Sequence, residues 1–337
     1  MMLLARSASR LVLRDAYPCS ITVLLVVRDE SRRILERLHN LQSTEWPPEK
    51  LQIVVVSDGS ADDTAEKARS VEGVKVLERA AASGKAACLN AGMELVCGDV
   101  VIFTDARQRF ERDVFQKLTA CFADDRVGAV SGALEIEQAA SGTGRGVDAY
   151  WRMEKRLRHD EALLDSSIGC TGAIYAMRRG FFRAIPEDTI LDDVVIPMQA
   201  AVAGARVLFE PEAVAYDPQT LEPEREKRRK VRTLVGNWQM LFRYPGWLLP
   251  WRNRLWWQLL SHKYLRLFAP VFLLMALICS GLMARQPFYA VLFGLQLAFY
   301  AAAAFGARLP AGFVFLNIMA LRAFWQFLRG DSRAVWK

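Results

Sequence analysis

At 337 residues the chain is longer than one average domain, and it is hydrophobic for a chain that carries this much charge. Hydrophobic residues make up 52% and charged residues 24%, the formal net charge is +7, and the mean hydropathy is +0.10. This combination predicts a globular part joined to a membrane part. The six cysteines have no CxxC spacing and do not cluster with the three histidines, which argues against a metal–thiolate site or a disulfide framework and favours a reducing, cytosolic compartment.

Residues 1–19 are mildly apolar, but three arginines interrupt the apolar run that a signal peptide needs. We interpret them as an N-terminal arm that is interfacial or poorly ordered. Basic residues are dense between Arg225 and Arg266 and sparse afterwards. A basic collar can hold nucleic acid, but beside apolar stretches it more often faces anionic lipid headgroups. We therefore expect membrane lipid, and no nucleic acid, as a partner.

From residue 20 onward, apolar runs alternate with stretches of helical spacing. The runs are rich in β-branched residues and predict buried strands at residues 21–27, 53–56, 74–77, 100–103 and, later, 206–209. The stretches between the first four runs predict helices near residues 34–41, 62–71 and 83–96. Strands that alternate with helices in this way form βαβ units. The sequence therefore predicts an α/β fold with a mostly parallel sheet.

Acidic residues follow three of the predicted strands directly. Glu30 lies just past the first strand, Asp58-Gly59 ends the second, and Asp105 follows the fourth. The carboxyl ends of parallel strands meet at one edge of a sheet, where open α/β sheets bind their ligands. Each residue alone has an ordinary explanation, because Asp-Gly is a common turn pair and an isolated aspartate often caps a turn or a helix. Their convergence on one edge favours a functional site.

Carboxylates and a lysine at such an edge suit a nucleotide diphosphate. One carboxylate can accept hydrogen bonds from base or ribose groups, and another can hold a divalent cation that stabilises a leaving diphosphate. We place Asp58, Lys85 and Asp105 around this site, with Asp193 as general base toward a hydroxyl acceptor. Alone, Lys85 is most often solvated, and the pair Asp192-Asp193 can simply stabilise a helix N-terminus through its dipole.

The pattern changes after residue 130. Small and charged residues predict a flexible loop at 141–146, a charged aromatic helix at 148–164 and a short strand within 169–179. The glycines of the loop do not follow a strand and open a helix, as a dinucleotide-binding fingerprint requires, so we discard that function. Residues 191–195 open another helix, which begins with the paired carboxylates.

An amphipathic helix at 225–243 presents an apolar face and a cationic face that includes Arg229 and Arg232. Guanidinium groups match phosphate geometry and can add charge near a leaving diphosphate, although alone such a face more often meets a membrane surface. Tryptophans at 247–257 suit the bilayer interface.

Three apolar runs follow. Residues 265–284 and 287–304 are long enough to span a bilayer. Residues 313–328 are short and include Arg322, so we expect a re-entrant or interfacial helix there. Basic residues before the first run and after the last predict that both ends are cytoplasmic, which two spans satisfy. We expect a multi-pass protein of the inner (plasma) membrane whose catalytic domain is cytoplasmic.

Five motifs resemble, in order, those of family 2 inverting glycosyltransferases with a GT-A fold. They are residues 55–64 (VVSDGSADDT), Ser83-Gly84-Lys85 with residues 89–92 (LNAG), Phe103-Thr104-Asp105-Ala106-Arg107, Gly172-Ala173 with Arg178-Arg179, and Leu191-Asp192-Asp193. Each motif alone is weak, but the ordered set, from about Ser20 to Trp238, is highly specific. The resemblance implies a GT-A-like, Rossmann-like catalytic domain followed by interfacial helices and C-terminal transmembrane helices.

The same resemblance implies roles for individual residues. Asp58 contacts the base, Asp105 contacts the ribose or a metal ion, Mg²⁺ or Mn²⁺, and Asp193 deprotonates the acceptor beside Asp192. The expected donor-binding residues are Glu30, Asp58, Lys85, Asp105, Arg229 and Arg232, and those on the acceptor side are Gly172, Arg178 and Trp151. The implied reaction moves a sugar from a nucleotide-sugar donor, expected to be UDP-linked, to a lipid-linked or polysaccharide acceptor in cell-surface or exopolysaccharide synthesis.

Two positions depart from the family pattern. Arg107 replaces the second aspartate of the Asp-x-Asp motif, so metal coordination depends on Asp105. The Gln-x-x-Arg-Trp motif of processive synthases corresponds to residues 229–233 (RKVRT), which keep only the arginine at 232. A processive polysaccharide synthase stays an alternative. In other classes, so do a non-enzymatic membrane scaffold that binds anionic lipid and, more weakly, a nucleotidyltransferase.

We expect five segments in the chain. They are an N-terminal arm (1–19), a GT-A catalytic domain (20–222), amphipathic or interfacial helices (223–262), a transmembrane region with two spans and a re-entrant or interfacial third helix (263–328), and a C-terminal tail (329–337).

Overall fold

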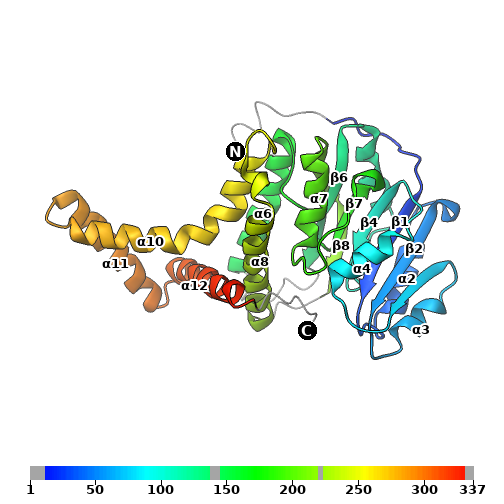
Figure 1. The fold of residues 1–337 in the computed structure, drawn as a ribbon, viewed down its shortest axis with the longest axis horizontal. Helices are drawn as coiled ribbons and strands as arrows, with labels where there is room; N and C mark the ends of the chain where they lie inside the picture. Colours follow the sequence, from blue (N-terminus) through cyan, green and yellow to red (C-terminus); the bar gives the residue numbers. More distant parts are fainter. Residues whose placement is uncertain (1–11, 137–144, 219–222, 331–337) are drawn as a thin grey trace. The chain divides into compact units, whose positions relative to one another are not determined.

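The structure, a computed structural model of the chain, describes residues 12–136, 145–218 and 223–330, with side chains except at 145–154 and 223–226 (Figure 1). Residues 1–11 of the expected arm, most of the expected loop at 141–146 and most of the tail lie outside these ranges. The chain divides into two compact units. Among the described residues, the first unit comprises everything up to residue 218 and Leu249–Leu255, and the second comprises residues 223–248 and 256–330.

The first unit is built on one sheet, which has eight strands in the described residues, in the order β3-β2-β1-β4-β7-β6-β8-β5. The strands are β1 (Ile21–Val27), β2 (Leu51–Asp58), β3 (Val74–Arg79), β4 (Val100–Thr104), β5 (Arg109–Phe110), β6 (Val127–Ile136), β7 (Ile174–Arg178) and β8 (Arg206–Asp217). β1 to β4 are parallel to one another, and β6 is parallel to β8. β7 is antiparallel to both β4 and β6, and β5 is antiparallel to β8. The predicted α/β fold with a mostly parallel sheet is confirmed.

Helices cover both faces of this sheet (Figure 1). They are α2 (Ile34–Gln42), α3 (Thr64–Arg69), α4 (Lys85–Met93), α5 (Val114–Ala120), α6 (Arg145–Leu164) and α7 (Asp192–Val202), with short 3₁₀ helices at Pro48–Lys50, Cys121–Ala123 and Arg179–Phe181. Successive residues of β1 point to opposite faces. Val23 and Leu25 share a hydrophobic cluster with the apolar face of α2, whereas Leu24 lies against Gly92 of α4. β1 and β4 are buried along their whole length, which explains their continuous apolar sequences.

β5 and β6 were not expected from the sequence, and β8 is longer than the expected strand at 206–209. Gly132 interrupts the apolar pattern of β6, yet the structure requires a glycine there. A Cβ atom on Gly132 would lie 2.5 Å from the carbonyl oxygen of Ala213 in β8, so the glycine allows the two backbones to approach closely. Gly132 is therefore a packing requirement of the sheet.

The direction of β7 determines which residues reach each edge of the sheet. Thr104 at the end of β4 pairs with Ile174 at the start of β7, and Val100 at the start of β4 pairs with Arg178 at the end of β7. The edge where β1, β2, β4, β6 and β8 end is therefore also the edge where β7 begins. We call it the carboxyl edge; Asp58 and Thr104 end their strands there.

The second unit contains long helices. They are α8 (Pro223–Arg243), α9 (Trp256–Leu259), a π-helical turn (Leu260–Tyr264), α10 (Leu265–Leu282), α11 (Pro287–Ala304) and α12 (Arg308–Leu328), with a 3₁₀ helix at Pro245–Leu248. In the described part of the chain, three helical stretches are long and apolar enough to cross a membrane: Trp256–Leu282, Pro287–Ala304 and Arg308–Leu328. The third begins five residues before the expected start at 313, so its length no longer argues against a span. The number of spans stays a prediction.

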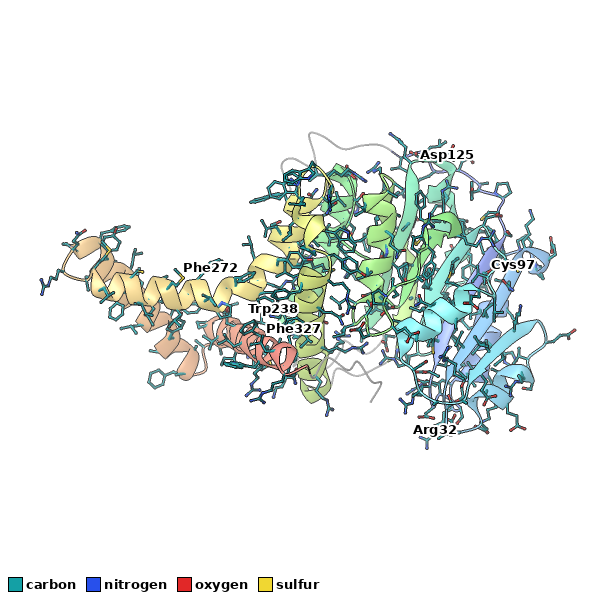
Figure 2. All side chains as sticks on the ribbon, viewed as in Figure 1. Arg32, Cys97, Asp125, Trp238, Phe272 and Phe327 are labelled. Atoms are coloured by element: carbon teal, nitrogen blue, oxygen red, sulfur yellow. The ribbon has the colours of Figure 1, made fainter. Side chains whose placement is uncertain are left out.

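Within the second unit, α12 packs on α8. The ring of Trp238 lies 5.0 Å from that of Phe324 and 6.4 Å from that of Phe327 (Figure 2). Gln296 of α11 donates from Nε2 to the carbonyl oxygen of Leu273 in α10 (2.8 Å), a type of bond that polar side chains make between membrane helices. Many large apolar side chains of α10, α11 and α12 are exposed, including Phe272, Leu282, Phe288, Leu295 and Leu309. Exposed apolar surface on this scale marks a membrane or protein contact.

Candidate active site at the carboxyl edge

Asp58, the last residue of β2, is fully buried. Its carboxylate accepts hydrogen bonds from the backbone N–H groups of Ser83 (2.6 Å) and Gly84 (3.0 Å), just before α4 begins. Gly59 permits this approach, because its φ is +61° and a Cβ atom there would lie 2.5 Å from the amide nitrogen of Ala82. Burial raises the pKa of Asp58, but the hydrogen bonds, led by that from Ser83, outweigh burial and lower the pKa below its ordinary value. An ionised Asp58 thus anchors the loop that precedes Lys85.

The loop after β1 is tied to the loop after β2. The backbone N–H of Glu30 donates to Oγ1 of Thr64 (2.9 Å), and the carboxylate of Asp29 accepts from the backbone N–H of Ala61 (2.8 Å). The carboxylate of Glu30 pairs with Arg33 at 3.0 Å. Glu30 therefore lies at the carboxyl edge, as predicted, but its carboxylate already has a cationic partner.

Lys85, the first residue of α4, contacts two carboxylates that come from different parts of the chain. Its Nζ lies 3.0 Å from Oδ1 of Asp105, just past β4, and 3.3 Å from Oδ2 of Asp192, at the N-terminus of α7. Burial lowers the pKa of Lys85, but the nearby carboxylates, Asp105 first, more than offset burial and hold the pKa above its ordinary value. The ammonium group is therefore charged, and it lies between the strand-end and the helix-end carboxylates.

Asp193 lies beside the loop that leads into β7. Its backbone carbonyl accepts a hydrogen bond from the N–H of Cys170 (2.8 Å), and a Cβ atom on Gly172 would lie 3.4 Å from its Oδ2. Gly172 thus keeps side-chain atoms away from one side of this carboxylate. The structure brings Gly172, Asp192 and Asp193 together with Lys85 and Asp105 at the carboxyl edge, because β7 begins there.

Sequence reasoning missed Arg37, a buried cation behind Asp105. Arg37 of α2 is 3% exposed, donates from its guanidinium to Oγ1 of Thr104 (2.7 Å) and lies 4.0 Å from the ring centre of Phe110. Burial lowers the pKa of Arg37 and the Asp105 carboxylate raises it, with burial the larger effect; a guanidinium nevertheless stays charged near neutral pH. The signal was present, since Arg37 lies on the same helical face as Ile34, Leu38 and Leu41, which are buried.

Sequence reasoning also missed Gln108, three residues past Asp105. Gln108 is 3% exposed, and its Nε2 donates to Oδ2 of Asp217 at the end of β8 (3.1 Å). Its Oε1 is buried and has no hydrogen-bond partner in the described part of the chain. Because Asp217 fixes the amide nitrogen, the amide oxygen is oriented and has unused capacity to accept a hydrogen bond or to ligate a hard cation.

Arg178 does not reach this site. It ends β7 at the opposite edge, where its guanidinium donates to the carbonyl oxygens of Val127 (2.9 Å) and Phe122 (2.6 Å) and to the hydroxyl of Tyr17 (2.7 Å). These bonds fasten the segment before β1 and the start of β6 to β7. The prediction that Arg178 lies on the acceptor side is therefore corrected, and the physical reason is the antiparallel direction of β7.

The structure says less about four other residues of interest. Arg229 and Arg232 are exposed on α8 in the second unit, so their part in donor binding stays a prediction. Trp151 belongs to α6, but its side chain lies outside the described part of the structure. Arg107 is partly exposed beside Asp105 and makes interactions of its own.

The chemistry of the carboxyl edge follows from its charges. Asp58, Asp105, Asp192 and Asp193 are acidic, and carboxylates repel phosphate, so a phosphate-bearing ligand needs positive charge from Lys85 or from a metal ion. In the described residues, no group of three His, Cys, Asp or Glu side chains is arranged to hold a metal by itself. A hard cation would therefore take oxygen ligands from its substrate as well as from Asp105.

Part of the chain matches a known protein family. Residues 22–185 match the family described as Glycosyl transferase family 2. A poly-β-1,6-N-acetyl-D-glucosamine synthase of Staphylococcus aureus is 26% identical over 233 residues, which are 66% of this chain and 56% of that protein. A β-monoglucosyldiacylglycerol synthase of Trichormus variabilis is 28% identical over 116 residues, 33% of this chain and 25% of that protein. The chain thus spans little more than half the length of the synthase.

A structural comparison extends over nearly the whole chain. A mannosyltransferase from Pyrobaculum calidifontis, solved in complex with GDP-Man and Mn²⁺, has a TM-score of 0.73 and 21% sequence identity, covering 97% of this chain and 94% of its own. At this identity the likeness establishes the fold, and it confirms the expected GT-A-like domain followed by helices. The family match gives residues 22–185 as a Glycosyl transferase family 2 domain and, with the motifs at the carboxyl edge, supports a glycosyltransferase.

Proposed function

We propose that the chain is a membrane-attached, inverting glycosyltransferase that moves a sugar from a UDP-linked donor to a lipid-linked or polysaccharide acceptor. The observation that carries this proposal is the contact of Lys85 with both Asp105 and Asp192. It joins the strand ends expected to bind the donor, which lie inside the family 2 match at residues 22–185, to the helix expected to carry the base, which follows that match.

Inversion requires a single displacement at the anomeric carbon. The leaving diphosphate and the acceptor hydroxyl lie on opposite sides of that carbon. Asp105 accepts a hydrogen bond from the nucleoside, the buried Asp58 holds the loop before Lys85 in place beside it, and Lys85 neutralises charge on the diphosphate. The acceptor hydroxyl approaches beside Gly172 and loses its proton to Asp193 as its oxygen bonds to the anomeric carbon. The bond from that carbon to the diphosphate breaks, and nucleoside diphosphate leaves.

The residues at the carboxyl edge fit a divalent cation, Mg²⁺ or Mn²⁺. Asp105 supplies a carboxylate, and the buried, unpaired Oε1 of Gln108 is a second oxygen within three residues of it. Cations of this class often bind through one or two protein oxygens plus substrate phosphates, so the absence of a second aspartate at Arg107 does not preclude such a site. The cation, when bound, offsets negative charge on the leaving diphosphate.

Membrane attachment rests on the three apolar helical stretches of the second unit. We propose that they lie in the inner (plasma) membrane with the catalytic domain on the cytoplasmic side, as the basic residues before the first apolar run and after the last favour. The exposed arginines of α8, Arg229 and Arg232 among them, then contact anionic lipid or the donor diphosphate.

A processive synthase is the second candidate, because the Staphylococcus aureus relative is named as a polysaccharide synthase. The loss of all but the arginine of the Gln-x-x-Arg-Trp motif argues against it. The length of the product separates the two functions. Purified enzyme that adds a single sugar excludes processive synthesis, whereas a ladder of products supports it.

The proposed function is tested by measuring nucleoside diphosphate release from a panel of nucleotide sugars, with membrane lipid extract as acceptor and Mg²⁺ or Mn²⁺ present. Acceptor-dependent release from a UDP-sugar is expected. Release of pyrophosphate would indicate a nucleotidyltransferase instead. If calorimetry detected no nucleotide-sugar binding with either metal, the non-enzymatic scaffold would replace the enzyme.

A further inference from the structure

Lys85 is placed rigidly between its two carboxylates. The loop before it is bonded to Asp58, and further along α4 Asn90 exchanges two hydrogen bonds with the backbone of Ile185, at 2.7 and 3.0 Å. Gly92 lets the same helix pack closely on β1 and β2, since a Cβ atom there would lie 2.5 Å from a methyl carbon of Leu24. The helix that carries Lys85 is thus fastened at several points, so the ammonium group can move only by side-chain rotation.

The Asp105 carboxylate is already matched by positive charge when no ligand is bound. The ammonium of Lys85 lies 3.0 Å from its Oδ1, and the Lys85 side chain is only 16% exposed, so water screens this pair weakly. The guanidinium of Arg37 lies behind it, on Thr104. A divalent cation that approached Asp105 would meet an ammonium group on the same carboxylate, and two like charges at such a distance repel strongly.

We propose that Lys85 is a resident cation that occupies Asp105 in the free enzyme and yields this carboxylate to the metal only when the nucleotide diphosphate binds. The proposal rests on the proposed function and specifies how its donor site is regulated. Asp192, 3.3 Å away, keeps one carboxylate for the ammonium after it leaves Asp105, and the diphosphate offers it a second anionic partner. Without the nucleotide, displacing Lys85 from Asp105 has no such compensation.

This arrangement makes metal and nucleotide binding interdependent. The metal binds Asp105 weakly in the free enzyme and more tightly with the nucleotide, and the nucleotide gains affinity from the metal by the same factor. The enzyme therefore takes up the metal together with the donor. Asp105 is also neutralised between turnovers, which keeps the carboxyl edge intact despite its excess of acidic groups.

The test is calorimetric titration of the purified full chain with MnCl₂, without nucleotide and then with saturating UDP. The Lys85→Met variant removes the ammonium, and Lys85→Gln is a second variant in case the first does not fold. Lys85→Arg keeps the charge. Lys117→Met is a matched control, because Lys117 also pairs with two carboxylates, Glu111 and Asp113, in contacts away from Asp105.

Without nucleotide, Lys85→Met and Lys85→Gln should bind Mn²⁺ about tenfold or more tightly than wild type, because a like charge has been removed from the metal's own carboxylate. Lys85→Arg and Lys117→Met should bind like wild type. With UDP present, the difference in Mn²⁺ affinity between Lys85→Met and wild type should shrink, because in the variant the diphosphate of UDP has lost a cationic partner.

Equal Mn²⁺ affinity in wild type and Lys85→Met without nucleotide would overturn the proposal. So would Lys85→Arg binding as tightly as Lys85→Met, or Mn²⁺ binding that is undetectable in every variant even with UDP. The first two outcomes leave the proposed glycosyltransferase untouched, and its failure would appear separately as absent nucleoside diphosphate release from wild type.

Discussion

β4 and β7 are antiparallel neighbours in the sheet, so opposite ends of the two strands lie at the candidate active site: the carboxyl end of β4 and the amino end of β7. Asp105 reaches the site because it follows the carboxyl end of β4. Gly172 reaches it because it precedes the amino end of β7. Arg178, only six residues after Gly172, lies about 20 Å away at the other edge. Position relative to the carboxyl edge, and not proximity in the sequence, therefore decides which residues can act on a substrate.

The largest effect in this comparison is expected at the end of β4. Asp105→Asn should lower turnover by about 10² to 10³-fold or raise the metal concentration needed for activity, because it removes the charge that can hold the cation. Steady-state nucleoside diphosphate release measured over a range of Mn²⁺ concentrations gives both quantities. Full turnover with an unchanged metal dependence would mean that the centre of the site lies elsewhere.

At the far end of β7 the expected effect is on stability. Arg178→Ala removes partly buried hydrogen bonds to Val127, Phe122 and Tyr17, so the free energy of unfolding should fall by about 2 kcal/mol. Urea unfolding in detergent, followed by tryptophan fluorescence, measures this loss. Turnover per folded molecule should be unchanged. If Arg178→Ala kept the stability of wild type but lost turnover, the expected role of Arg178 on the acceptor side would be supported after all.

In the loop after β2, a substitution at Gly59 tests whether the close approach of the Ala81–Ala82 backbone to this residue is required for stability. Gly59→Ala and Gly73→Ala both place a side chain at positive φ, +61° and +78°, but only at Gly59 would the new Cβ atom meet backbone, 2.5 Å from the nitrogen of Ala82. Gly59→Ala should therefore destabilise the protein by about 2 kcal/mol more than Gly73→Ala. The same unfolding experiment compares them, and equal losses would show that the loop before Lys85 adjusts freely.

The smallest effect compares two glycines at the two ends of β7. Gly172→Ala adds a methyl group 3.4 Å from Oδ2 of Asp193, whereas Gly180→Ala meets nothing within 4 Å. Crowding beside the proposed base should lower turnover about tenfold in Gly172→Ala, with donor affinity unchanged and with little effect in Gly180→Ala. If both variants turned over like wild type, the acceptor would have to approach Asp193 from another side.

The positions of the carboxylates at the strand ends were predictable from the sequence because their signals are local. A buried parallel strand has a continuous apolar sequence, and the acidic residue at its end follows directly, as at Asp58 and Asp105. The direction of β7 depends on pairing with strands far along the chain, so Gly172 and Arg178 could not be separated by sequence alone. Gln108 was missed for a similar reason, since its partner Asp217 is 109 residues away. Arg37 had a local signal, its place on the buried face of α2, but its partner Thr104, 67 residues away, was not predictable.

Two elements differ from expectation. The third apolar run was expected to start at residue 313, whereas α12 begins at Arg308. Pro310 lies in the first turn of that helix, where proline is tolerated because the first backbone N–H groups have no partner within the helix. β6 was not expected, and the close approach of its Gly132 to β8 leaves no signal in the sequence other than a missing side chain.

The central claim is that carboxylates at the carboxyl edge carry out sugar transfer with Asp193 as base. The most direct measurement pairs turnover with donor binding in wild type and Asp193→Asn, using nucleoside diphosphate release and calorimetry on the same preparations. The account predicts that turnover falls by about 10³-fold while donor affinity stays within about threefold of wild type. Turnover at the wild-type rate in Asp193→Asn would contradict it and would remove Asp193 as the base.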